Sequence, residues 1–352
     1  MKRRDFLRGS SGLLVSMVAG EKIAFGAEAH SPSAGEEILK DVMIIDAHAH
    51  PDEFWSDRSP TDMSSSLVSI QKLGMRACAF SAVGDRERGM WEESFFGIMG
   101  QLGRAMQYVK SGRATLVRTS SDISKTVKPN EPVGCILAIE GANPLQRDIR
   151  YFDEVYQYGV RIITLGHYVI NDFTDIMTKP PKHGGLSTLG KQAVKKMDNL
   201  GIVIDVAHAS FDAIKDIANI SQRPLIDSHT SLCHNDTLPC GRYRTWREME
   251  VIANTGGMVC TWPIKRRRED YRRETFLDWA KEILEMKKRI GIEHVGLGTD
   301  GGGHLPDTVD GYDDVRDLRK LAAAMREVGL SRDDIAAYMG GNFYRVFKAY
   351  TG

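Results

Sequence analysis

The segment Val42-Met43-Ile44-Ile45-Asp46-Ala47-His48-Ala49-His50 joins a short apolar run to a pair of histidines. The apolar run predicts a buried β-strand. Side chains alternate in direction along a strand, so His48 and His50 are expected to lie on one face, where the pair can bind one metal ion. The segment therefore predicts a strand that ends at a metal site.

Seven further runs of this kind follow, and helical patterns separate them. The eight predicted strands start near Val42, Arg76, Gly134, Val160, Gly201, Pro224, Gly257 and His294. Alternating strands and helices indicate a parallel sheet, and eight repeats favour a (β/α)8 TIM-type barrel. A doubly wound open sheet is the alternative. Such barrels reach ~250 residues or more as one domain, so residues 30–352 are expected to form a single metallohydrolase barrel.

Polar or ionisable residues end six of the eight predicted strands. They are His48, His50, Glu140, His167, His208, His229 and Asp300. Each alone is typical of a structural or solvated residue. Together they would bury several charges in one mouth of the barrel, which is too costly unless they bind metal or pair with one another. The remaining histidines are expected to be surface or structural residues: His30, His183, His234, His294 and His304.

Imidazole and carboxylate ligands without cysteine favour Zn2+, with manganese, iron and cobalt as alternatives. Glu140 comes between the H-x-H pair and the later histidines, so it is placed to bridge two ions. Two divalent metal ions about 3.5 to 4 Å apart activate a shared hydroxide for hydrolysis. The pattern therefore predicts a binuclear site.

The first 29 residues are predicted to be a twin-arginine signal peptide. Lys2-Arg3-Arg4-Asp5-Phe6-Leu7-Arg8 precedes a short apolar stretch, Gly12 to Val18, and the small-residue site Ala27-Glu28-Ala29. The predicted partner is the twin-arginine export machinery, and the predicted location is periplasmic or extracytoplasmic. A disordered basic N-terminus is the alternative.

Composition is that of a globular protein, with 42% hydrophobic and 27% charged residues and a formal net charge of zero. This balance gives no reason to expect nucleic acid or a membrane surface as a partner. Whether the chain forms a homodimer is left open.

Three cysteines, Cys78, Cys135 and Cys260, lie in apolar runs and are expected in the core. Cys233 and Cys240 are close enough in sequence to pair in an oxidising compartment if the geometry permits, which the sequence leaves open. The long stretch from Met90 to Lys128 holds more than one crossover helix and predicts a lid or an interface.

A basic run, Lys265-Arg266-Arg267-Arg268 with Arg272 and Arg273, follows the seventh predicted strand. One interpretation is a solvated helix start balanced by Glu269, Asp270 and Glu274. The other is a preference for acidic substrates.

Several segments resemble the renal, or membrane, dipeptidase family of the amidohydrolase superfamily over residues 40–350. In chain order they are Ala138-Ile139-Glu140-Gly141, the run from Gly159 to His167, Gly185-Leu186-Ser187, the run from Asp205 to Ser210, Ser228-His229-Thr230-Ser231, the run from Val295 to Asp300, and Gly341-Asn342-Phe343-Tyr344-Arg345-Val346.

The resemblance implies a binuclear zinc peptidase that cleaves dipeptides with a free C-terminal carboxylate by means of a metal-bridging hydroxide. By the same resemblance the metal ligands are His48, His50, Glu140, His208 and His229. Asp300 matches the proton-transfer residue and His167 a substrate-contacting histidine. Arg242 is the best match for the arginine that binds the substrate carboxylate, with Arg244 as the alternative.

Three departures from the family pattern stand out. His50 replaces the aspartate of the usual H-x-D pair, Asp300-Gly301-Gly302-Gly303 lacks the second acid of D-F-D-G, and the loop from Leu232 to Gly241 is longer. Rival functions are another amidohydrolase activity (lactonase, deacetylase or nuclease) and an exported metal-binding protein.

Overall fold

The computed structural model describes residues 32–56, 66–85, 94–123, 129–234, 240–267 and 271–352. The predicted signal peptide, His30, and Arg268, Glu269 and Asp270 of the basic run lie outside the described residues.

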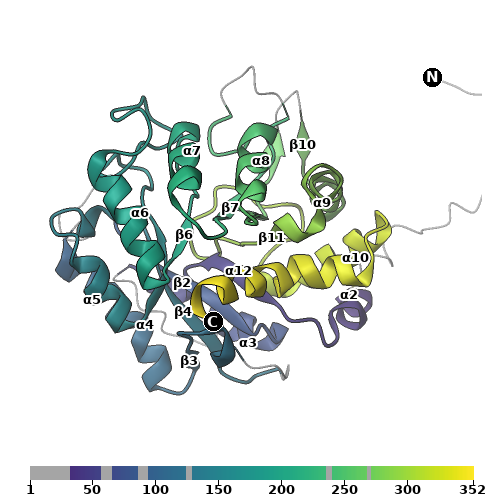
Figure 1. The fold of residues 1–352 in the computed structure, drawn as a ribbon. Coiled ribbons are helices and arrows are strands. Elements are labelled where there is room, and N and C mark those ends of the chain that lie inside the picture. The colour runs from purple at the N-terminus through teal and green to yellow at the C-terminus, as the bar shows by residue number, and fades with distance from the viewer. Residues whose placement is uncertain (1–31, 57–65, 86–93, 124–128, 235–239, 268–270) are drawn as a thin grey trace, which may run out of the picture.

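Eight parallel strands form a nearly closed barrel surrounded by helices (Figure 1), which confirms the predicted (β/α)8 fold. The strands in order around the barrel are β1 (Ile45–Ala49), β2 (Ala77–Val83), β4 (Val133–Glu140), β5 (Val160–Thr164), β6 (Val203–Asp205), β7 (Ile226–Thr230), β8 (Met258–Thr261) and β11 (Val295–Leu297). All eight predicted strand positions are thus confirmed. A parallel bridge between Ala49 and Gly301 joins the last strand's loop to the first strand.

Helices cross between successive barrel strands on the outside. These are α3 (Ser66–Leu73), α4 (Phe95–Lys110), α5 (Tyr151–Tyr158), α6 (Thr188–Leu200), α7 (Phe211–Ile220), α8 (Trp246–Asn254) and α9 (Phe276–Ile290). Hydroxyl side chains cap the starts of α6, α7, α8 and α9, each accepting a backbone N–H from the first turn. Within the described ranges, no helix has the length and apolar character needed to cross a bilayer.

The remaining helices lie at the two ends of the chain. They are α2 (Pro32–Leu39), which precedes β1, and α10 (Leu318–Glu327), α11 (Arg332–Ala336) and α12 (Asn342–Thr351), which follow β11. Figure 1 shows α2 beside α10 and α12 passing over the strands.

The barrel interior is a core separate from the layer between strands and helices. Inward-facing strand residues such as Ile45, Ile136 and Met258 pack there against Phe343 and Phe347 of α12. Since α12 belongs to this inner core, it closes the base of the barrel and leaves the opposite mouth for the site. Cys78, Cys135 and Cys260 are buried, as expected.

In the stretch from Met90 to Lys128, which was expected to form a lid or an interface, the described residues after α4 pack against the barrel and form no lid. The expected interface stays a prediction. After α4 the stretch forms β3 (Ala114–Leu116), which pairs in parallel with the start of β4. Val117 and Ile123 follow β3 and enter the inner core. Burial of these two apolar side chains holds the segment against the barrel base, away from the strand ends that carry the site.

The expectation of a helix start in the basic run is also wrong, because its described part forms an antiparallel pair, β9 (Arg266–Arg267) with β10 (Arg272–Arg273). Its charges are paired with acids. Lys265 Nζ lies 2.6 Å from Asp310, Arg267 Nε lies 2.9 Å from Glu274, and buried Arg273 lies 2.8 Å from Glu282. Much of the basic charge at this edge of the mouth is therefore neutralised.

Candidate metal centre

The five predicted metal ligands and Asp300 meet at the carboxyl ends of the strands. Glu140 is the last residue of β4, His48 and His229 lie in β1 and β7, and the others follow their strands within three residues: His50, His208 and Asp300. His208 and Asp300 have left-handed φ angles of 65° and 53°. Such backbone is costly for non-glycine residues and is typical of functional sites.

One oxygen of Glu140 faces the histidines of the first strand. Glu140 Oε2 lies 3.4 Å from His48 Nε2 and 3.5 Å from His50 Nε2. The two imidazole nitrogens are 3.2 Å apart, and Asp300 Oδ1 lies 3.4 Å from His50 Nε2. These nitrogen and carboxylate atoms form one compact donor set.

The other oxygen of Glu140 faces the later histidines. Glu140 Oε1 lies 3.0 Å from His208 Nε2 and 3.4 Å from His229 Nε2, and the two nitrogens are 3.1 Å apart. Glu140 thus stands between two sets of donors, one oxygen to each. Both sets contain the nitrogen and oxygen atoms that divalent transition metals prefer, so the residues fit two ions.

The environments of Glu140, His208 and His229 favour the protonation states in which these residues bind metal. Burial alone would raise the pKa of Glu140, but the charges of His167 and His48 and the hydrogen bond from His208 hold that pKa well below its ordinary value. Burial, with the positive charge of Arg242, holds the pKa values of His208 and His229 well below normal. The carboxylate is therefore ionised and these two imidazoles are neutral, the forms that bind metal.

His50 stands where the family that the sequence resembles has an aspartate. It offers a ring nitrogen as a donor, and a hydrogen bond on the other side of the ring holds it in position. Its Nδ1–H donates to the Ser81 carbonyl oxygen at 2.7 Å, which directs Nε2 toward the site. Burial disfavours the charged form, yet hydrogen bonds to Asp300 and Glu140 outweigh it and raise the pKa of His50 to about 10. Metal binding at His50 must therefore release a proton.

A serine and an aspartate behind the ligands were missed by the sequence reasoning. Ser228 Oγ lies 2.9 Å from His229 Nδ1 and 3.3 Å from His48 Nδ1. Ser228 donates its own proton to Asp205 at 2.6 Å, so its oxygen is left to accept from the two rings. Asp205 also accepts from Thr164 at 2.7 Å. Ser228 and Asp205 therefore orient ligands from two different strands.

His167 is paired with Asp85, a second residue that the sequence reasoning missed. The Asp85 carboxylate lies 2.5 Å from His167 Nδ1 and accepts two backbone N–H groups, from Tyr168 and Val169. Burial opposes protonation, but the charges of Glu140 and Asp85 raise the pKa of His167 above normal. His167 Nε2 lies 3.6 Å from Glu140 Oε1, beside the second donor set. Asp85 lies two residues after the end of β2, so its place at a strand end was a usable signal.

The donor sets line a hollow of about 400 Å³ at the mouth. Trp55, Tyr168 and His304 form part of its wall. His304 was expected to be a surface or structural residue, and its side chain is exposed at the rim of the mouth, on the loop after β11. Its Nε2 lies 3.1 Å from Glu53, and Trp55 Nε1–H donates to the Gly302 carbonyl oxygen at 3.2 Å. His183, His234 and His294 make structural contacts elsewhere.

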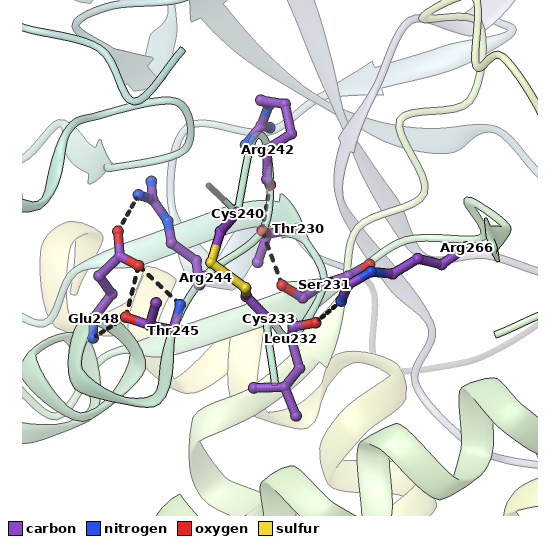
Figure 2. Close-up of a disulfide and its surroundings, with 10 residues drawn as sticks. All are labelled: Thr230, Ser231, Leu232, Cys233, Cys240, Arg242, Arg244, Thr245, Glu248 and Arg266. Atoms are coloured by element: carbon purple, nitrogen blue, oxygen red, sulfur yellow. Dashed lines mark hydrogen bonds and ion pairs between the residues drawn. A yellow bond between two sulfur atoms is a disulfide. The ribbon is translucent and has the colours of Figure 1, made fainter. Parts of the chain in front are cut away.

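Arg242 and Arg244 have different environments, and their side chains point in different directions in Figure 2. Arg244 is fully buried and bonded to Asp227 at 2.6 Å and Glu248 at 3.0 Å, which makes it structural. Arg242 lines a hollow beside the metal centre and donates to the His229 carbonyl oxygen at 3.1 Å. Only Arg242 of the pair is placed to meet a substrate.

Cys233 and Cys240 form a disulfide (Figure 2), which answers the question that the sequence left open. It links the end of the His229 segment to the residues just before Arg242. The backbone around it is also tied, because Cys233 N–H donates to the Arg244 carbonyl oxygen at 2.7 Å. The disulfide therefore fixes the base of the segment that presents Arg242.

Residues 34–351 match the family model described as membrane dipeptidase (Peptidase family M19). Dipeptidase verJ of Clonostachys rogersoniana is 31% identical over 68% of this chain and 61% of its own length. The chain spans about half to three fifths of the curated relatives that it matches.

Solved structures share the fold. The probable dipeptidase PvdM from Pseudomonas aeruginosa has a TM-score of 0.78 at 20% identity, over 93% of this chain and 99% of that one. A metallo peptidase from Rhodobacter sphaeroides, liganded with a phosphinate mimic of the dipeptide L-Ala-D-Ala, has a TM-score of 0.75 at 20% identity, over 88% and 99%.

Replacing Glu140 with Gln removes the charge shared by the two donor sets while keeping the side chain's shape. We expect the purified wild-type protein to carry between one and two equivalents of a divalent transition metal, and Glu140→Gln to carry less. Elemental analysis of both proteins measures this. Glu53→Gln, a carboxylate change at the rim, is the control and should keep the wild-type content. A full metal complement in Glu140→Gln would show that the carboxylate does not hold the ions.

Proposed function

Because the chain belongs to the membrane dipeptidase family, we propose that it is a metal-dependent dipeptidase that hydrolyses dipeptides with a free C-terminal carboxylate. The observation that carries this proposal is the position of Glu140, whose two oxygens each face a pair of histidine nitrogens at 3.0 to 3.5 Å. A basic side chain, Arg242, lines an adjoining hollow.

We assign the two ions to the residues around Glu140, with Zn2+ as the favoured metal. His48 and His50 would hold one ion, His208 and His229 the other, and Glu140 both. When bound, the two ions would activate a hydroxide between them and polarise the scissile carbonyl. The chain's own residues position the substrate and move the proton.

Asp300 is the proposed proton carrier. Its carboxylate stands beside the first donor set, with Oδ1 3.4 Å from His50 Nε2, and its side chain is 12% exposed, so it faces the hollow. It would accept the proton of the attacking water and pass it to the amine that leaves.

His167 and Arg242 are the proposed substrate contacts. The raised pKa of His167 favours an imidazolium, which can stabilise the negative charge that develops on the carbonyl oxygen. Arg242 can pair in a bidentate manner with the C-terminal carboxylate. Arg242 has no carboxylate within ion-pair distance among the described residues, so a substrate carboxylate would supply the missing opposite charge.

The rival functions draw less support. A nuclease needs a basic mouth for phosphates, but Lys265, Arg267 and Arg273 are paired with acids. A metal-storage protein has no need of Asp300 or of a charged His167 beside the donor sets.

We also propose that the protein is exported by the twin-arginine machinery to a periplasmic or extracytoplasmic location. The motif at Arg3-Arg4 is the primary support. The Cys233–Cys240 disulfide adds to it, because disulfides persist mainly in oxidising compartments.

Asp300→Asn should lower kcat by roughly 10² to 10⁴, because the amide cannot accept the proton. Steady-state kinetics on a dipeptide, with metal content measured on the same sample, provide the test. Asp307→Asn on the same loop is the control. Near-normal turnover would assign the proton to another group. If the variant also lost metal, Asp300 would be assigned as a metal ligand and not as the proton carrier.

Arg242→Ala should lower kcat/KM for a dipeptide by roughly 10- to 150-fold, since charged hydrogen bonds contribute ~1.5 to 3 kcal/mol. The same dipeptide with an amidated C-terminus should be barely affected. Arg247→Ala, an exposed arginine on α8, is the control variant. Equal losses on both substrates would make Arg242 structural.

Changing Arg3 and Arg4 together to lysine should trap the precursor in the cytoplasm. Cell fractionation followed by immunoblotting measures this, with Lys22→Arg as a control outside the motif. Normal accumulation of the doubly changed protein outside the cytoplasm would refute twin-arginine export.

A further inference from the structure

A second hollow of about 250 Å³, here called the side pocket, adjoins the metal hollow. The two share Tyr168, Asp300, Gly303 and His304 in their walls, so they lie side by side. The rest of the side pocket is lined mainly by apolar or aromatic side chains: Tyr243, Trp262, Ile264, Leu305 and Pro306. A group that enters from the metal centre therefore meets these aromatic and aliphatic side chains beside the polar groups of Arg242 and Asp300.

Arg242 is the basic side chain on that wall. Its guanidinium lies over the Trp262 ring at 5.1 Å and donates to the His229 carbonyl oxygen at 3.1 Å. A carboxylate bound to Arg242 would place the α-carbon attached to it in the side pocket. The side chain on that carbon would then lie near Tyr243, Ile264 and Leu305.

The neighbouring cations do not make the side pocket attractive to acids. Lys265 is paired with Asp310 at 2.6 Å, and Arg267 lies 3.0 Å from Asp307. Arg266 is buried, donates to the Leu232 carbonyl oxygen and packs with its guanidinium 4.2 Å from the Tyr243 ring centre. The Tyr243 ring therefore both packs against the Arg266 guanidinium and lines the side pocket.

We propose that the side pocket receives the side chain of the substrate's C-terminal residue and selects dipeptides in which that residue is bulky and apolar or aromatic. This inference rests on the proposed function. The basic run from Lys265 to Arg273 also allowed a preference for acidic substrates. This inference opposes that interpretation, because it gives the pocket beside the run a preference for apolar substrates.

The test uses the metal-loaded full chain with Gly-Leu, Gly-Phe, Gly-Gly and Gly-Glu. Burial of a large apolar side chain should raise kcat/KM for Gly-Leu and Gly-Phe about 10- to 150-fold over Gly-Gly. Gly-Glu should not exceed Gly-Gly. Calorimetric binding of the same dipeptides to the metal-free protein should give the same order of affinity, and this measurement does not depend on turnover.

Leu305→Lys tests the wall directly, because Leu305 is half-buried on a loop and a lysine there puts a cation in the pocket. The ratio of kcat/KM for Gly-Leu to that for Gly-Glu should fall at least tenfold in this variant. Phe96→Lys, at an exposed α4 position that lines neither hollow, is the matched control and should keep the wild-type ratio.

The outcomes separate the two proposals. Hydrolysis of all four dipeptides at similar kcat/KM would overturn the side-pocket inference and leave the dipeptidase proposal standing. An unchanged ratio in Leu305→Lys would also overturn the inference. No hydrolysis of any dipeptide by fully metal-loaded protein would overturn the dipeptidase proposal, and the calorimetric order would then decide the side pocket alone.

Discussion

The burial of the Glu140 carboxylate among imidazoles is the constraint on which the rest of the site depends. Its side chain is only 3% exposed, and its two oxygens meet nitrogens from strands β1 and β7 and from the loop after β6. An unpaired charge at such a depth would be strongly destabilising. The strands must therefore converge closely enough to surround Glu140, and a closed parallel barrel achieves this convergence.

Two buried aspartates, Asp205 and Asp46, link the site residues to the strands of the barrel by hydrogen bonds. Asp205 at the end of β6 holds Ser228, which in turn contacts the rings of His48 and His229. Asp46 in β1 accepts from Thr299 N–H at 2.8 Å, next to Asp300, across the seam between the first and last strands. Burial raises the pKa of Asp46 to about 6 despite these hydrogen bonds. Barrel closure and orientation of the site residues thus use the same polar groups.

The sequence predicted the barrel and the residues that gather at its mouth because both follow from local patterns. Apolar runs mark strands, and the polar residue at the end of a run needs no tertiary information to be found. Ser228 was missed because its role depends on His48, which lies 180 residues away in the sequence. The base-closing segment after α4 was included in a predicted lid or interface because nothing local in Val117 or Ile123 shows which barrel end they cover.

The partners of Arg242 and Arg244 show which of the two is free to bind a substrate, a question that their spacing in the sequence left open. Arg244, two residues from Arg242, has Asp227 and Glu248 as partners inside the protein, so a ligand would have to compete with both. Arg242 contacts a carbonyl oxygen and the Trp262 ring but has no carboxylate within ion-pair distance among the described residues. A partly buried guanidinium without an anion is stabilised when a carboxylate binds to it. The disulfide at Cys233–Cys240 anchors the chain just before Arg242, so little freedom need be lost when a substrate carboxylate supplies the missing anion.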